Sequence, residues 1–140
     1  MVETIEQVTI KNKDLQTVYD VLFNIPLNGN KSRHRTKFVN NIKEAYEEYA
    51  KDRQDMINEF SKKDENGNII KDPKDSRSII LNIDEFPNAK EDILAIDEEK
   101  AVIVVRDKYI LLDIIDNMEI QLSGEKAIII DTLAEQLEEY

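Results

Sequence analysis

The sequence predicts an α+β fold in a single small domain, residues 1–140. The prediction rests on the size of the chain, on short segments in which polar and apolar residues alternate, and on longer segments with apolar residues at helical spacing. The 140 residues are 41% hydrophobic and 35% charged, with only three glycines and three prolines. A chain of this length and composition buries one hydrophobic core. We expect an N-terminal strand, a long amphipathic helix, a small sheet or hairpin and C-terminal helices.

A strand and a short helix are predicted at the N-terminus. In residues 4–10, TIEQVTI, apolar and polar side chains roughly alternate and β-branched side chains are frequent, which favours a strand. Residues 15–23 carry apolar side chains at helical spacing, and Asn12 or Asp14 is the candidate N-cap. Pro26 forces the end of this helix because proline cannot continue it.

A long amphipathic helix is predicted over residues 36–61. The turn residues 28–30, NGN, precede it, and Ser32 or Thr36 is the candidate cap. Its apolar side chains recur every three or four residues for about six turns, which is the pattern of a helix with one buried face. They are Phe38, Ile42, Ala45, Tyr46, Tyr49, Met56, Ile57 and Phe60.

Short elements are predicted between residues 68 and 105. Segments 68–71 and 77–83 flank the turn-forming sequence DPKD at 72–75, which indicates a hairpin or an exposed loop. Residues 88–94 fit a short helix. The apolar run AVIVV at 101–105 is typical of a buried strand.

Two further segments are predicted near the C-terminus. Residues 107–118 have the spacing of a helix, but their isoleucine content leaves a strand open. A final helix begins near Ser123 and carries apolar residues on one side. They are Ile129, Ile130, Leu133 and Leu137.

The composition excludes several classes of protein. The chain has no cysteine, which excludes disulfides, thiol nucleophiles and thiolate metal sites. Because the sequence has one histidine and no recognisable phosphate-loop, zinc or hydrolase motif, we expect no enzymatic activity, no catalytic residue, no metal and no cofactor. The apolar runs are far shorter than a membrane span, and the N-terminus lacks the pattern of a signal peptide. We therefore expect a soluble intracellular protein without membrane contact.

Charge is distributed unevenly along the chain. The net charge is -11, and residues 83–140 hold sixteen acidic and five basic side chains. Residues 31–43, which we call the basic segment, hold five basic side chains and no acidic one. The overall negative field repels phosphate, which disfavours direct nucleic-acid binding.

The basic segment provides the candidate site. If this helix begins near its candidate cap Ser32, then Arg33, His34 and Arg35 occupy its first turn, where the helix dipole is positive and a cation costs roughly a few tenths of a kcal/mol. A sequence that breaks a local rule in this way is typical of a functional or specially paired site. Free backbone N–H groups, arginines and a hydroxyl at this point would bind an anion or the carboxylates of a partner. The candidate residues are Lys31, Ser32, Arg33, His34, Arg35 and Lys37.

Two interpretations of the basic segment stay open. In the first, it packs against the acidic C-terminal region of the same chain as an ionic strap. In the second, it binds an external anion or a partner protein.

Four short motifs carry a resemblance. They are NKDL at 12–15, KSRHRTKF at 31–38, DENG at 64–67 and LSGE at 122–125. In this order they resemble a family of small uncharacterised proteins that phages and prophages of Gram-positive bacteria encode, with the Ser-Arg-x-Arg-Thr-Lys block at 32–37 as its signature. The resemblance implies a phage origin, and with it the host cytoplasm, and it brings no catalytic assignment.

Three functions compete. The first is a non-enzymatic interaction protein that binds a host or phage protein and would inhibit a host defence or nucleic-acid enzyme, with the acidic C-terminal region imitating nucleic-acid phosphates. The second is an accessory structural or assembly protein of the virion, whose helices would form oligomer contacts, including those of a homo-oligomer. The third is a module that binds a phosphate-bearing ligand such as a nucleotide. Its residues would be Ser32, Arg33, Arg35 and Lys37.

Overall fold

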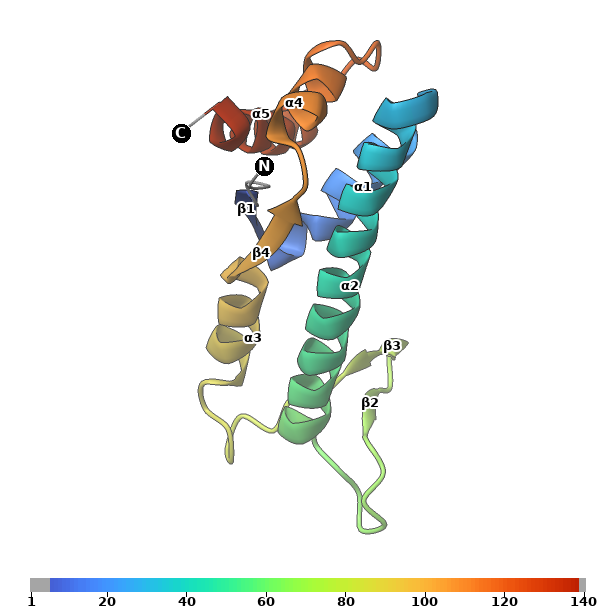
Figure 1. Ribbon diagram of the computed structural model, residues 1–140. Coiled ribbons are helices and arrows are strands. Elements are labelled where there is room, and N and C mark those ends of the chain that lie inside the picture. The colour runs from blue at the N-terminus through green and yellow to red at the C-terminus, as the bar shows by residue number, and fades with distance from the viewer. Residues whose placement is uncertain (1–5, 139–140) are drawn as a thin grey trace. The chain divides into compact units, whose positions relative to one another are not determined.

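The computed structural model describes residues 6–138, and for residues 76–78 it describes the backbone only. The chain forms two compact units. Unit 1 contains residues 6–47 and 99–138, and unit 2 contains residues 48–98. Helices and short antiparallel strands build both units, which confirms the predicted α+β class (Figure 1). A single domain over the whole chain stays a prediction.

Unit 1 contains a two-stranded antiparallel sheet. β1 (Glu6–Lys11) pairs with β4 (Lys100–Val105) in a register that sets Val8 opposite Ile103. β1 confirms the N-terminal strand predicted over residues 4–10, whose first two residues lie outside the described part of the chain.

One face of this sheet is buried and the other is exposed. The buried side chains alternate along both strands at Val8, Ile10, Ile103 and Val105. On the other face, Val102 and Val104 are 58% and 41% exposed. The strand predicted over residues 101–105 is confirmed, but its predicted burial is wrong for alternate residues, because only one face of the sheet is covered.

Helices cover the buried face of the sheet and share its core. Their bounds are α1 (Leu15–Phe23), α2 (Gly29–Phe60), α4 (Lys108–Asp116) and α5 (Gly124–Glu138), with a 3-10 turn at Asn12–Asp14 before α1. α5 packs against α1, α4 and β1. The helices predicted over residues 15–23 and after Ser123 are confirmed, and the open choice for residues 107–118 resolves as the helix α4.

The start and the exposed side of α1 differ from the prediction. Asp14 occupies its N-cap position, but the side chain makes no capping hydrogen bond. Phe23, which shares the apolar spacing, is 56% exposed and stacks on Tyr19 with the ring centroids 5.4 Å apart. The buried residues of this helix are Leu15, Val18, Val21 and Leu22.

α2 begins earlier than the sequence predicts. It begins at Gly29, so the candidate caps Ser32 and Thr36 lie inside the helix and the predicted start is wrong. The physical reason is the φ angle of 59° at Gly29, a left-handed conformation that glycine adopts without strain and that lets the chain turn into the helix.

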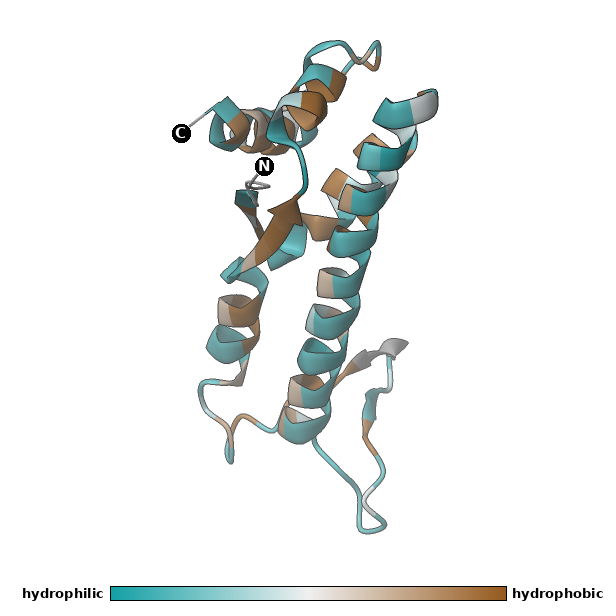
Figure 2. Cartoon of the chain, viewed as in Figure 1, coloured by the Kyte–Doolittle hydropathy of each residue, from teal (hydrophilic) through white to brown (hydrophobic). Residues whose placement is uncertain are grey.

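Only part of the predicted apolar stripe of α2 is deeply buried. Within unit 1 the buried residues are Phe38, Val39 and Ile42. The later stripe positions, from Tyr49 to Phe60, are half-buried. Figure 2 accordingly shows hydrophilic residues along most of α2 and apolar residues along β4.

Unit 2 contains the second part of α2, a hairpin and α3 (Ala89–Glu98). β2 (Lys71–Asp72) and β3 (Asp75–Ile79) pair antiparallel, which confirms a hairpin around residues 72–75. α3 confirms the helix predicted over residues 88–94 and extends it.

A polar cluster and an aromatic pair join the elements of unit 2. The Tyr49 hydroxyl and Arg53 Nε both donate to Oδ1 of Asp97, the latter at 2.9 Å. The hydrogen bond to Asp97, together with its charge, holds the pKa of Arg53 above its usual value. The Phe60 and Phe86 rings pack with their centroids 5.0 Å apart.

Side-chain amides occupy the open edges of the sheet in unit 1. On α5, Gln136 accepts from the Thr9 N–H at 2.7 Å and donates to the Thr9 carbonyl at 2.8 Å. On α2, Asn41 donates to the Val104 carbonyl at 3.1 Å. Each amide supplies hydrogen bonds that a third strand would otherwise make, so the edge is less available for non-specific pairing.

Replacing Gln136 by leucine should lower the free energy of unfolding by about 1–3 kcal/mol, because the Thr9 peptide group loses both partners. The amide proton of Thr9 should exchange faster with solvent, as measured by hydrogen-exchange NMR. The exposed neighbour Glu135 provides the control, since Glu135→Leu leaves these bonds in place. An unchanged exchange rate of the Thr9 amide proton in Gln136→Leu would contradict the hydrogen bonds between Gln136 and Thr9.

Replacing Gly29 by alanine should cost about 1–2 kcal/mol through backbone strain alone. No atom lies within 4 Å of the position that a Cβ would take, so steric overlap does not contribute. Gly29→Asn should cost clearly less, because asparagine tolerates the left-handed region. Urea unfolding of the two variants measures the difference, and equal costs would refute the strain argument.

Candidate functional site

The basic segment lies on the N-terminal turns of α2, and its side chains point in different directions. Because the helix begins at Gly29, Lys31 lies in the first turn and residues 33–35 lie in the second. The predicted placement of Arg33, His34 and Arg35 in the first turn is therefore wrong. The unfavourable effect of the dipole is smaller than predicted, since it falls off within the first turn.

Arg35 binds the end of α1. Its Nη1 donates to the carbonyl oxygens of Leu22 and Phe23, both at 3.1 Å, and to that of Ile25 at 2.6 Å. The last carbonyls of a helix lack intrahelical partners and lie at the negative end of its dipole, so a cation stabilises them. Arg35 Nε is buried and has no hydrogen-bond partner among the described residues. Arg35 therefore belongs to the fold and joins α1 to α2.

Lys31 pairs with the acidic C-terminal region. Its Nζ lies 2.6 Å from Oδ2 of Asp113 on α4, and both side chains are about half exposed. An exposed pair of this kind contributes roughly 0–1 kcal/mol. Among the residues that the structure describes, the ionic strap is thus present as one ion pair, whereas Arg35 contacts carbonyl groups instead of acids.

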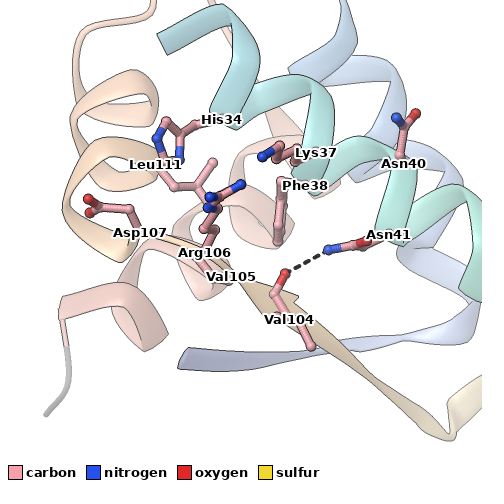
Figure 3. A pocket seen from close by; sticks show the side chains of 10 residues that line it. All are labelled: His34, Lys37, Phe38, Asn40, Asn41, Val104, Val105, Arg106, Asp107 and Leu111. Carbon is pink, nitrogen blue, oxygen red and sulfur yellow. Dashed lines mark hydrogen bonds between the residues drawn. The ribbon is translucent and has the colours of Figure 1, made fainter. Parts of the chain in front are cut away.

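A pocket of about 430 Å³ lies beside α2 in unit 1 (Figure 3). α2 forms one wall, and the end of β4 with the start of α4 forms the other. The buried side chains of Phe38, Val105 and Leu111 give it an apolar floor. The remaining lining residues are His34, Lys37, Asn40, Asn41, Val104, Arg106 and Asp107.

Two polar side chains of the lining make hydrogen bonds within the protein, and one of them joins the two walls. Asn41 donates to the Val104 carbonyl, as described above. Asp107 caps α4, because its Oδ1 accepts from the backbone N–H groups of Tyr109 at 3.0 Å and Ile110 at 3.2 Å. Both therefore already have partners in the protein itself.

Three basic side chains complete the pocket. His34 and Lys37 lie three residues apart on one face of α2, and Arg106 comes from the connection between β4 and α4. Their nitrogen-bearing ends point toward a common space in Figure 3. Within residues 6–138 we find no hydrogen bond or ion pair for any of the three. Basic side chains that lie together without an ion-pair partner among the described residues are suited to an oxyanion such as a carboxylate or a phosphate.

The structure brings together only part of the predicted site. His34 and Lys37 line the pocket, whereas Ser32 and Arg33 do not. Arg33 is exposed and Ser32 is half-buried. The residues of the predicted anion site therefore lie in several different surroundings. Successive residues of a helix point 100° apart, so neighbours in the sequence face different parts of the molecule.

Sequence reasoning missed Arg106. The residue lies far along the chain from the basic segment, and only the fold brings the two together. One signal was available, because Arg106 and Asp107 connect a predicted strand to a predicted helix. Such connections often carry binding residues on a rigid scaffold.

Other kinds of site find no support in the described part of the chain. Residues 6–138 contain no group of three or more histidine, aspartate and glutamate side chains placed to hold a metal ion. Among the described helices, none combines the length and apolar character that crossing a membrane requires.

Arg33 and Arg35 form a matched pair for a stability test. Arg35→Ala should lower the free energy of unfolding by about 2 kcal/mol, because hydrogen bonds from a charged group to three carbonyls are lost. Arg33→Ala should change it by less than about 0.5 kcal/mol, since this side chain is exposed. Chemical unfolding measures both, and equal effects would show that Arg35 does not hold α1.

Comparison with curated proteins and with solved structures gives no match. A family model described as "Protein of unknown function (DUF1617)" matches residues 6–140. The match covers nearly the whole chain and agrees with the resemblance to a family of uncharacterised proteins. The protein therefore belongs to the DUF1617 family of proteins of unknown function.

Proposed function

We propose that this DUF1617 protein is a non-enzymatic interaction protein, encoded by a phage, that binds a host or phage protein in the host cytoplasm. The binding surface is the exposed cationic face of α2, formed by Arg33 and Lys37. The observation that carries the proposal is that these two cations lie one turn apart and exposed, in a segment without acidic residues.

The internal contacts of the basic segment support this assignment. Lys31 and Arg35 have partners within the fold, so their positive charges serve internal contacts. Arg33 and Lys37 make no such contribution among the described residues. In a chain of net charge -11, a surface with no neutralising acid is suited to attract and orient an acidic partner.

The distribution of charge over the chain favours a protein over a nucleic acid as the binding partner. A duplex carries phosphate along its whole length, so it would extend from the cationic face toward the many acidic residues of this chain. A compact acidic patch on a protein can contact the cationic face alone. The partner should therefore present a few carboxylates on a small surface.

Reversing the charge of the cationic face should abolish partner binding. The double variant Arg33→Glu/Lys37→Glu, tagged and expressed in infected Gram-positive host cells, should lose a protein that co-purifies stoichiometrically with the wild type. The loss follows because like charges across an interface repel. Affinity purification followed by mass spectrometry measures it.

Lys43→Glu is the matched control for this experiment. Lys43 is an exposed cation of the same helix, but it lies on a different face, near Tyr19 and Tyr46. The control should retain the partner. Equal recovery of the partner with the double variant and with the wild type would contradict the proposal, as would the absence of any stoichiometric partner in the wild-type sample.

A further inference from the structure

We propose that the pocket lined by His34, Lys37 and Arg106 binds the phosphate group of a small phosphorylated organic ligand. This inference goes beyond the proposed protein interaction, because Arg106 and the pocket floor lie outside the Arg33–Lys37 face.

The first argument is the convergence of basic groups. His34 and Lys37 reach the pocket from α2 and Arg106 reaches it from the β4–α4 connection, so an anion between them is contacted from two sides (Figure 3). A guanidinium offers planar donors that match two phosphate oxygens, and an ammonium adds a point charge.

The second argument is charge balance. Lys37 and Arg106 supply two permanent positive charges, which match a phosphate monoester of about −1.5 to −2 at pH 7 better than a single carboxylate. The one acidic side chain of the lining, Asp107, is bound to the N-terminus of α4. Its carboxylate points away from Lys37 in Figure 3.

The third argument is the size and floor of the pocket. A volume of about 430 Å³ falls within the range of small-ligand sites and exceeds the needs of a bare phosphate ion. Val104, which is 41% exposed, provides apolar surface for the carbon skeleton of a ligand beside the buried Phe38, Val105 and Leu111. The pocket therefore suits a phosphate attached to an organic group.

The test is an NMR titration of the full-length ¹⁵N-labelled chain at constant ionic strength. Inorganic phosphate, adenosine monophosphate and acetate serve as probes of the phosphate, of the phosphate with an organic group, and of a carboxylate. Adenosine monophosphate should shift amide signals of residues 34–41 and 104–111. It should bind at least about tenfold more tightly than inorganic phosphate, and acetate should bind most weakly.

Variants connect these shifts to the pocket. Arg106→Gln should weaken binding of adenosine monophosphate by at least about tenfold, because a charge-assisted hydrogen bond is lost. Lys37→Gln provides a second, independent variant with the same expectation. Lys43→Gln, outside the pocket, should bind as the wild type does.

Several results would overturn the inference. They are shifts that lie outside the pocket residues, wild-type affinity in Arg106→Gln and Lys37→Gln, or equal affinity for acetate and for adenosine monophosphate. Equal affinity for inorganic phosphate and for adenosine monophosphate would refute the role of the apolar floor. Because Arg106→Gln leaves Arg33 and Lys37 unchanged, it should still recover the protein partner. A variant that loses phosphate binding but keeps the protein partner therefore separates the two proposals.

Discussion

The guanidinium group of Arg35 binds the carbonyl oxygens at and just after the end of α1, and together with the buried Phe38, Val39 and Ile42 it fixes which side of α2 faces the core. The contact ties the second turn of α2 to the last turn of α1 through hydrogen bonds of 2.6 to 3.1 Å. Because successive side chains of a helix are separated by 100°, fixing Arg35 also fixes the directions of its neighbours. His34 and Lys37 consequently line the pocket beside the end of β4, and both Lys37 and Arg33 are exposed to solvent. The pocket and the exposed cationic face both depend on this orientation of α2.

The basic segment therefore has a divided role. Two of its cations stabilise the fold, Arg35 through carbonyl groups and Lys31 through Asp113. The exposed Arg33 and Lys37 make no such contact among the described residues. Of the two interpretations drawn from the sequence, the internal strap applies to Lys31, and an external binding surface stays a proposal for other residues of the same segment. An experiment that mutates Arg33 and Arg35 together would mix a loss of stability with a loss of binding.

Much of the fold could be predicted because local patterns determine it. The spacing of Leu15, Val18 and Leu22 marks α1, and DPKD marks the hairpin of unit 2. Three features could not be predicted from the sequence. The start of α2 depends on a left-handed glycine, and the half-exposed β4 depends on how many faces of the sheet are covered. Arg106 was missed for a third reason, since its proximity to Lys37 is a tertiary contact without a sequence spacing.

Arg35 belongs to the fold, whereas the exposed Arg33 is not held by it. NMR of the arginine side chains in the full-length protein tests this difference most directly, through the rotation of each guanidinium group and the exchange of its protons with solvent. The account predicts hindered rotation and slow exchange for Arg35, whose Nη1 is held by three carbonyls, and fast averaging for Arg33. Indistinguishable behaviour of the two arginines would contradict the division of the basic segment.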